Sequence, residues 1–251
     1  MPEQKVIDIS YHNGNIDFNK VSKQVDTVII RCGYGDNYSK QDDKMFHTYM
    51  KNAISVGMNI GVYIYSYAKS TTQAASEANH IIRLVEQYKD YPRLSKVLWY
   101  DVEEQYQIPL ANRLFETFAN NVKDYGYTAG LYMSESYFNQ SCPIGVGDAP
   151  LWIAKYGTNK GTPQTKPIVK GAISLWQFTS VGKVDGIDGN VDMSLLYDET
   201  IFTNKGRITD FDSAMKVLVE KGAIATPDYW YNAAKVVKYL PDLIINMANT
   251  L

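Results

Sequence analysis

The sequence predicts an α/β fold, a modified β/α barrel with helices missing after the later strands, followed by a small all-α C-terminal domain. Up to residue 133, short apolar runs typical of strands alternate with segments of helical periodicity. From there to about residue 193, strand-like runs continue with loops between them. Alternation of this kind implies parallel strands joined by right-handed crossovers, as in β/α barrels.

The first half of the chain contains the strands and helices that alternate. The expected strands are 6–10, 27–33, 58–67, a run from residue 96 to the acids near 103, and 128–133. The expected helices are 18–24, 44–56, 72–88 and 110–125. Asp17 is placed to cap the first helix, and Gly57 and Gly126 follow the ends of two others.

The second half has strand patterns without a convincing helix until residue 204. The expected strands are 151–156, 172–178, 181–184 and a short segment around 190–193. A linker at 203–206 then separates a barrel domain, 1–203, from a helical domain, 204–251. In the helical domain we expect helices over 211–221, from 226 and up to about 249, around apolar residues that form a small core: Met215, Leu218, Trp230, Val237, Leu240 and Ile244.

Composition excludes several classes of protein. The net charge is −2, which gives no field to attract nucleic acid or an anionic membrane. The chain has no run of 18 apolar residues and no signal-peptide pattern at its N-terminus, so we expect synthesis in the cytoplasm. Cys32 and Cys142 are far apart and the three histidines are scattered, so no metal site or disulfide framework is expected.

Acidic residues follow the predicted strands. Asp101 and Glu103 share one face of the strand that begins near residue 96, because side chains on a strand alternate. Asp8 lies near the carboxyl end of the first strand and Asp192 lies in the last. In a β/α barrel the active site lies at the carboxyl ends of the strands, which favours a catalytic role for all four acids. The alternatives are a loop-capping role for Asp8 and a turn role for Asp192; nearby Asp188 is expected to be a turn residue.

The chain resembles glycoside hydrolase family 25, the Chalaropsis-type lysozymes of bacteria and phages. The matching segments, in chain order, are Asp8-Ile9-Ser10, Tyr63-Ile64-Tyr65-Ser66, Asp101-Val102-Glu103, Leu151-Trp152-Ile153-Ala154, Trp176-Gln177-Phe178-Thr179-Ser180 and Gly186-Ile187-Asp188-Gly189-Asn190-Val191-Asp192. One segment departs from the family. Many members carry Lys-x-Ser/Thr-Glu-Gly after the second strand, whereas this chain has Arg31-Cys32-Gly33-Tyr34-Gly35.

The resemblance implies cleavage of the β-1,4 bond between N-acetylmuramic acid and N-acetylglucosamine in peptidoglycan, without a cofactor. It implies that Glu103 is the general acid, with a pKa raised by its apolar surroundings and its acidic neighbours. Asp101 is expected to stay ionised and to orient the substrate's N-acetyl group, whose oxygen attacks the anomeric carbon. A direct protein nucleophile or an activated water is the alternative. Asp8 and Asp192 are expected to support these two acids.

Aromatic residues and one arginine are the candidates for substrate binding. The chain has 20 tyrosines, whose flat faces and hydroxyls suit sugar binding as well as protein interfaces. Tyr63, Tyr65, Trp152 and Trp176 are expected to line the cleft, with barrel core as the alternative. For Arg31, contact with substrate and pairing with a core acid remain equally open.

Three biological settings follow from the resemblance. The apparent lack of a signal peptide favours a phage endolysin, released through a membrane hole that another protein makes. A bacterial autolysin of the same activity, or an inactive carbohydrate-binding barrel, is the alternative. The helical domain is expected to bind the cell wall through the run Tyr229-Trp230-Tyr231, with homodimer formation or structural support as the other roles.

Overall fold

The computed structural model describes residues 4–141, 147–202, 211–237 and 240–248. The chain divides into two compact units, Met1–Thr203 and Asn204–Leu251. Two features of the sequence, the predicted linker at 203–206 and Cys142, lie outside the described residues. Cys32 is a free thiol and is buried.

The larger unit is a closed barrel whose eight strands neighbour one another in sequence order. The strands are β1 (Lys5–Ile9), β2 (Thr27–Tyr34), β3 (Asn59–Tyr65), β4 (Leu94–Asp101), β5 (Thr128–Ser134), β6 (Leu151–Ala154), β7 (Ile173–Gly182) and β8 (Val191–Leu196). This arrangement confirms the predicted barrel. The two strands expected at 172–178 and 181–184 are one strand, β7.

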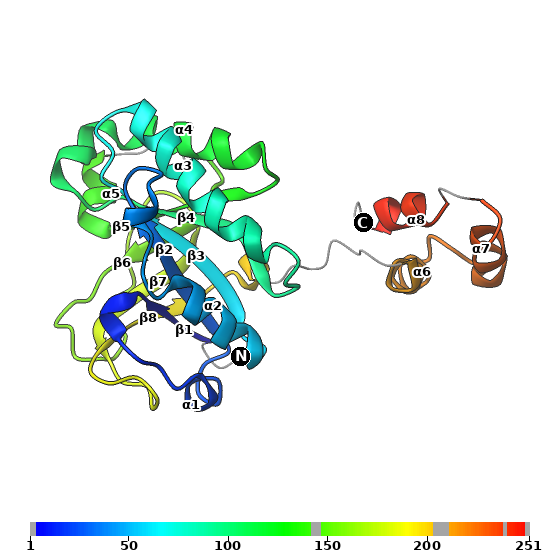
Figure 1. Ribbon diagram of the computed structural model, residues 1–251, viewed down its shortest axis with the longest axis horizontal. Coiled ribbons are helices and arrows are strands. Elements are labelled where there is room, and N and C mark those ends of the chain that lie inside the picture. The colour runs from blue at the N-terminus through cyan, green and yellow to red at the C-terminus, as the bar shows by residue number, and fades with distance from the viewer. Residues whose placement is uncertain (1–3, 142–146, 203–210, 238–239, 249–251) are drawn as a thin grey trace. The chain divides into compact units, whose positions relative to one another are not determined.

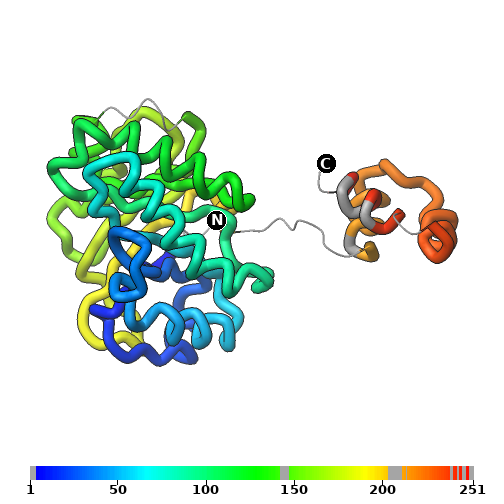
Figure 2. Tube along the Cα trace, turned by 45° about the horizontal axis from the view of Figure 1, so that its top comes forward, coloured from blue at the N-terminus to red at the C-terminus, as the bar shows by residue number. Residues whose placement is uncertain are grey.

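Strand β8 runs opposite to the other strands. The pairs from β1–β2 to β6–β7 are parallel, whereas β8 is antiparallel to both β7 and β1. The segment between Gly182 and Val191 is too short for a helical crossover, so the chain turns back on itself. In Figure 2 the blue first part and the yellow last part of this unit belong to one compact body. The antiparallel pair of β1 and β8 closes the barrel.

Helices cover the outside of the barrel beside the early strands (Figure 1). They are α1 (Phe18–Val21), α2 (Phe46–Ser55), α3 (Thr71–Val85), α4 (Ala111–Lys123) and α5 (Glu135–Ser141). Asp17 caps α1 as expected, with its carboxylate accepting from the backbone N–H groups of Asn19 and Lys20. Helix α5 was not expected from the sequence; it is short and only Phe138 is buried on it.

Two apolar layers hold this unit together. The outer layer lies between the strands and the helices and contains Ile7, Ile30, Phe118 and many other apolar residues. The inner layer fills the barrel and includes three large aromatic side chains, Trp99, Tyr132 and Trp152. Gly130 makes room for the first of these, because a Cβ at that position would lie 2.5 Å from the Trp99 ring.

Residues after β8 close the amino-terminal end of the barrel. Ile201 and Phe202 are buried within the inner layer, and the Ser95 hydroxyl donates a hydrogen bond to the Ile201 carbonyl. Gly61 on β3 provides space for the Phe202 ring, which would lie 3.0 Å from a Cβ there. The opposite end, where the parallel strands finish, is therefore the end available for a site.

The smaller unit consists of α6 (Phe211–Glu220), α7 (Pro227–Ala234) and α8 (Leu240–Ala248). Pro227 begins α7, a position where a missing N–H costs nothing. The expected core residues Met215, Leu218, Leu240 and Ile244 are buried. Trp230 packs against this core only in part, and Val237 is 49% exposed because it follows the end of α7, so the prediction that Val237 belongs to the core is wrong.

Candidate active site

A cavity of about 360 Å³ lies at the carboxyl end of the parallel strands, and every strand of the barrel contributes a side chain to it. From β1 to β8 these are Asp8, Arg31, Tyr63 with Tyr65, Asp101, Tyr132, Trp152, Gln177 and Asp192. Residues from the loops complete the lining: Ser10, His12, Asn13, Glu103, Tyr156 and Asn190. The four acids predicted from the sequence thus line one cavity.

Strand alternation places the acids. On β4, Trp99 points into the barrel and Tyr100 points out into the outer layer, so Asp101 points in again. Glu103 lies two residues beyond the end of β4 and is partly exposed. Asp101 is therefore the deeper of the two acids and Glu103 lies nearer the mouth of the cavity.

Asp8 and Asp192 are direct cross-strand neighbours in the antiparallel β1–β8 pair. The sequence predicts Asp192 in the last strand, near its carboxyl end. It lies instead at the start of β8, and it reaches the same rim because β8 is reversed. Opposite residues in an antiparallel pair are about 5 Å apart at Cα, so these two carboxylates face each other across the closure of the barrel.

Burial raises the pKa of every acid in the cavity, and the charges of neighbouring acids add to this for Asp8, Asp101 and Glu103. Burial raises the pKa of Asp8 well above its usual value, and the charge of Asp192 adds to the effect. Burial raises the pKa of Asp192 to about 6. The pKa of Glu103 is raised by burial, partly offset by a hydrogen bond from Tyr132. The cluster therefore holds protons at pH values where exposed carboxyls are ionised.

The surroundings of Asp101 oppose its ionised form, which is the form expected from the sequence. Its side chain is 4% exposed, and burial together with the charges of Glu103 and Asp8 raises its pKa well above the usual value. Arg31 opposes this shift, but it is a smaller influence. Among the described residues, the Oδ1 atom of Asp101 has no hydrogen-bond partner. An ionised Asp101 thus needs a donor from outside the barrel.

Gln177 bonds directly to one of the acids, although the sequence predicted no role for it. Its Nε2 donates to Oδ2 of Asp8 at 2.9 Å. Its Oε1 accepts from the hydroxyls of Tyr132 at 2.7 Å and Tyr156 at 2.6 Å. Two hydroxyl donors fix the amide oxygen, so the amide nitrogen must face Asp8.

Tyr132 lies between this amide and the general-acid candidate. It has one hydroxyl proton, and both Gln177 Oε1 and the Glu103 carboxylate lie within its reach. It can donate that proton to one of them at a time. Two signals could have identified these residues. Gln177 is a polar residue within the apolar run of β7, and Tyr132 has an inward position on β5.

Three of the four predicted aromatic residues line the cavity: Tyr63, Tyr65 and Trp152. Trp176 does not. It points outward from β7 into the layer beneath the helices, where it packs on Phe178 and donates from its indole N–H to the Lys155 carbonyl at 2.9 Å. Neighbouring residues on a strand face opposite sides, so Gln177 rather than Trp176 reaches the cavity.

Arg31 combines the two roles that the sequence left open. It lines the cavity, and its Nε and Nη2 atoms both lie 2.9 Å from Oδ2 of Asp43. Asp43 is buried and is itself held by the backbone N–H groups of Tyr11 at 3.0 Å and Met45 at 2.9 Å. This chain therefore anchors its arginine with an acid from the loop after β2.

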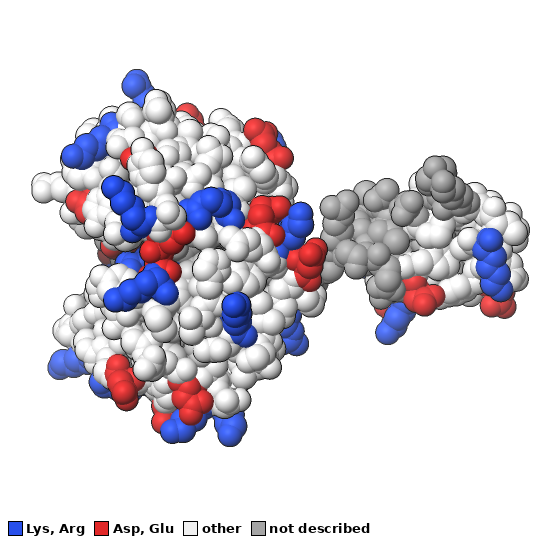
Figure 3. Space-filling view, viewed as in Figure 1, with Lys and Arg blue, Asp and Glu red and all other residues white. Residues whose placement is uncertain are grey.

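Two further properties of the described ranges bear on the type of site. They hold no group of three or more His, Cys, Asp or Glu residues placed to bind a metal ion. No helix within them is both long and apolar enough to cross a membrane. Positive and negative side chains are interspersed over the face of the larger unit that Figure 3 presents.

Comparison with known proteins identifies the barrel. The family model for glycosyl hydrolases family 25 matches residues 7–187, which include three of the four acids and nearly all of the barrel. The chain belongs to glycosyl hydrolase family 25. This result confirms the resemblance inferred from the sequence motifs.

Relatives of this family 25 chain include bacterial and phage proteins. An autolytic lysozyme of Clostridium acetobutylicum is 27% identical over 231 residues, which cover 87% of this chain and 66% of that protein. The chain therefore spans just under two thirds of that relative's length.

Two solved structures have the same fold. The catalytic domain of endolysin ply40 from bacteriophage P40 of Listeria monocytogenes is 25% identical, with a TM-score of 0.67 over 79% of this chain and 95% of that one. The modular autolysin LytC of Streptococcus pneumoniae is 29% identical, with a TM-score of 0.66 over 78% of this chain and 47% of that one.

Proposed function

We propose that this chain is a peptidoglycan hydrolase that cleaves the β-1,4 bond between N-acetylmuramic acid and N-acetylglucosamine. The observation that carries the proposal is the convergence of Asp8, Asp101, Glu103 and Asp192 on one cavity of a family 25 barrel. Glycoside cleavage requires a proton for the leaving oxygen and a negative group near the developing oxocarbenium ion. A cluster of carboxyls with raised pKa values provides both.

Glu103 is the proposed general acid. It is less buried than Asp101, and burial raises its pKa, which favours the protonated form that a general acid needs. It would give this proton to the glycosidic oxygen as the bond to the anomeric carbon breaks. The resulting carboxylate would then remove a proton from the water that completes hydrolysis.

Asp101 is the proposed partner of the substrate's N-acetyl group. Its unpartnered Oδ1 atom needs a hydrogen-bond donor, and the acetamido N–H is one. That bond would orient the acetamido carbonyl oxygen to attack the anomeric carbon and form a cyclic oxazolinium intermediate. This substrate-assisted route makes Asp101 a positioning and stabilising group, whereas a direct route would require it to form a bond with the sugar.

Asp8 and Asp192 are proposed to hold negative charge on the far side of the cavity and to bind sugar hydroxyls. Tyr63, Tyr65 and Trp152 are the proposed substrate contacts, and Arg31 is a further one through its place in the lining. Trp176 is excluded from this set by its outward position.

Release of reducing ends from Gram-positive cell walls tests the proposed reaction. Wild type should clear a wall suspension and generate new reducing ends, and Glu103→Gln should lower the rate by about 100- to 10,000-fold. The matched control is Glu116→Gln on an exposed position of α4, which should retain the wild-type rate. Wall binding without new reducing ends would support the inactive carbohydrate-binding barrel instead.

We propose that the smaller unit binds the cell wall. Tyr229 on α7 is 67% exposed, which suits an aromatic contact with sugar, whereas Trp230 contributes partly to the core of the unit. Tyr229→Ser should weaken sedimentation with walls while cleavage of small soluble fragments stays the same. Homodimer formation through the same helices is the second candidate, and sedimentation velocity of wild type and Tyr229→Ser distinguishes the two.

The biological setting that we propose is attack on a bacterial wall, in one of two forms. Lysis of a host by a phage is supported by the likeness to the endolysin domain, and wall remodelling by a bacterium is supported by the autolytic relatives. The proposed reaction is the same in both.

A further inference from the structure

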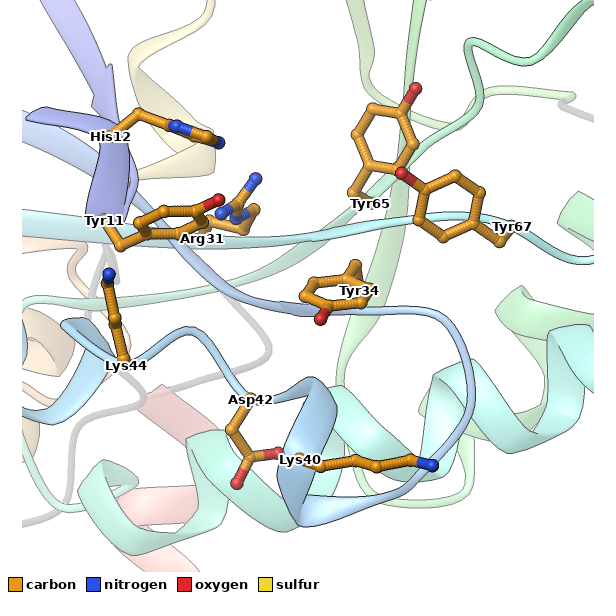
Figure 4. Close-up of a pocket in the computed structure, with 9 residues that line it drawn as sticks. All are labelled: Tyr11, His12, Arg31, Tyr34, Lys40, Asp42, Lys44, Tyr65 and Tyr67. Atoms are coloured by element: carbon orange, nitrogen blue, oxygen red, sulfur yellow. The ribbon is translucent and has the colours of Figure 1, made fainter.

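A second and larger cavity, of about 670 Å³, adjoins the acidic one. The two share three lining residues: His12, Arg31 and Tyr65. The second cavity is otherwise lined by Tyr11, Tyr34, Lys40, Asp42, Lys44 and Tyr67. Figure 4 shows Tyr65 and Tyr67 on one side and Tyr11 with Arg31 on the other, while Tyr34 lies between them. Any substrate held at the four acids therefore has this cavity beside it.

The charge of the second cavity is opposite to that of the first. Lys40 and Lys44 are exposed, and no ion pair to either occurs within the described parts of the chain. The Lys44 amine lies 4.5 Å from the centre of the Tyr11 ring, a cation–π contact that brings no negative charge to it. Figure 4 shows this amine directed toward that ring.

The one acid of the second cavity is already neutralised. Asp42 accepts two hydrogen bonds from Arg83, one from Nη2 to Oδ1 at 2.5 Å and one from Nη1 to Oδ2 at 3.1 Å. The Oδ1 atom of Asp42 also lies 2.8 Å from Nε2 of His80. These contacts hold the pKa of Asp42 below its usual value. Asp42 thus does not cancel the two lysines, and the cavity has an excess of positive charge.

The segment that forms this wall is also the one that departs from the family pattern. Where many members have an acid after the second strand, this chain has Tyr34 and Gly35. Gly35 has φ +61°, a backbone conformation that favours glycine over residues with a side chain. The loss of an acid at this point makes the wall more positive than the family pattern implies.

We propose that the second cavity binds the carboxylate groups of the stem peptide that is attached to muramic acid. This inference rests on the proposed muramidase function, because only then does a peptide-bearing sugar occupy the adjoining site. The peptide leaves the muramic acid ring from one side of the glycan and carries free carboxylates. Lys40 and Lys44 attract them, and the four tyrosines provide flat faces for the apolar parts of the peptide.

Three soluble substrates with the same glycan test the proposal: one without peptide, one with a peptide carrying free carboxylates, and one with the same peptide amidated. Wild type should prefer the carboxylate form in kcat/KM. The double variant Lys40→Gln, Lys44→Gln should lower the ratio of carboxylate to amidated rates by about four- to twentyfold, mainly through KM. Raising the salt concentration should lower this ratio in wild type and have little effect in the variant.

Lys96→Gln is the matched control, because the Lys96 amine also lies over a tyrosine ring, 4.9 Å from that of Tyr127, outside both cavities. It should leave the ratio at the wild-type value. An unchanged ratio in the double variant, or an equal loss with all three substrates, would overturn the proposal.

A binding measurement separates this inference from the proposed reaction. Calorimetric titration of Glu103→Gln with the carboxylate and amidated forms should give tighter binding of the carboxylate form, and the two lysine changes should remove the difference. Equal affinities for both forms would refute the peptide site even if the glycan is cleaved. Absence of cleavage by wild type, with the affinity difference present, would refute only the proposed reaction.

Discussion

Gln177 on β7 donates a hydrogen bond to Asp8 on β1 at 2.9 Å, across the intervening strand β8. The amide of Gln177 is oriented by two tyrosine hydroxyls, so a donor faces Asp8 permanently. This bond favours the ionised form of Asp8 against burial and against the charge of Asp192, which both favour the protonated form. Gln177 is therefore a positioning residue for the acid cluster.

Gln177→Glu should lower kcat/KM at neutral pH by about 10- to 100-fold, because it replaces the donor with another acid that repels Asp8. Part of the rate should return as the pH falls, since one proton shared between the two carboxyls restores a donor. The measurement is the pH profile of reducing-end release. Gln87→Glu, at an exposed position, is the matched control. A loss that is the same at every pH would argue for a purely structural role.

The alkaline limb of the pH profile should report the protonation of Glu103, and two substitutions should move it in opposite directions. The charge of Asp192 raises the pKa of Glu103 and the Tyr132 hydroxyl lowers it. Asp192→Asn should therefore shift the limb to lower pH, and Tyr132→Phe should shift it to higher pH, each by about 0.5 to 1 on the pH scale. Each pH profile is normalised to its maximum rate, so that the lower activity of the variants does not affect the comparison of the limbs. Shifts in the same direction would exclude Glu103 as the titrating acid.

Asp192→Asn should stabilise the fold at neutral pH. Burial raises the pKa of Asp192 to about 6, above its value in the unfolded chain, so the folded state binds the proton more tightly. The contribution of this proton to the free energy of unfolding is fully present below about pH 4, and it is lost as the pH rises through about 6. The variant should exceed wild type by about 1 to 3 kcal/mol at pH 7 in free energy of unfolding, with no comparable gain at pH 4.

Chemical denaturation at the two pH values measures this difference. Asp188→Asn, which removes the same charge from an exposed turn, is the control and should change stability little. A gain of the same size at pH 4 and pH 7 would mean that ionisation of Asp192 is not its source.

Substitution of Trp152 should affect substrate binding, and substitution of Trp176 should affect the stability of the fold. Trp152 lines the cavity and donates from its indole N–H to the Ser194 hydroxyl at 2.9 Å, whereas Trp176 lies in the outer layer. Trp152→Phe should raise KM. Trp176→Phe should leave KM unchanged and lower the free energy of unfolding by about 1 kcal/mol or more, because its hydrogen bond to Lys155 is lost. Kinetics and denaturation of both variants test this, and a raised KM for Trp176→Phe would contradict the assignment.

The strand order and the acids could be read from the sequence because both depend on local patterns. Apolar runs alternate with helical periodicity, and the acids of β1 and β4 follow directly from the ends of those runs. The short helix α5 and the exposed position of Val237 could not be read, because neither has a strong periodic signal. The hydrogen-bonded set of Tyr132, Tyr156 and Gln177 joins residues more than 20 positions apart with Asp8, and no local pattern encodes that contact.

The sequence by itself determined the barrel, its family and which carboxyls could carry the reaction. The tertiary structure decided which of two neighbouring residues faces the cavity. A shift of one residue along a strand exchanges its two faces, so Trp176 and Gln177 could not be assigned before β7 had a register. The structure also decided the direction of β8, because antiparallel closure against β1 brings Asp192 opposite Asp8. It placed Lys40 and Lys44 beside the acids, since a loop's position depends on the helices that pack against it.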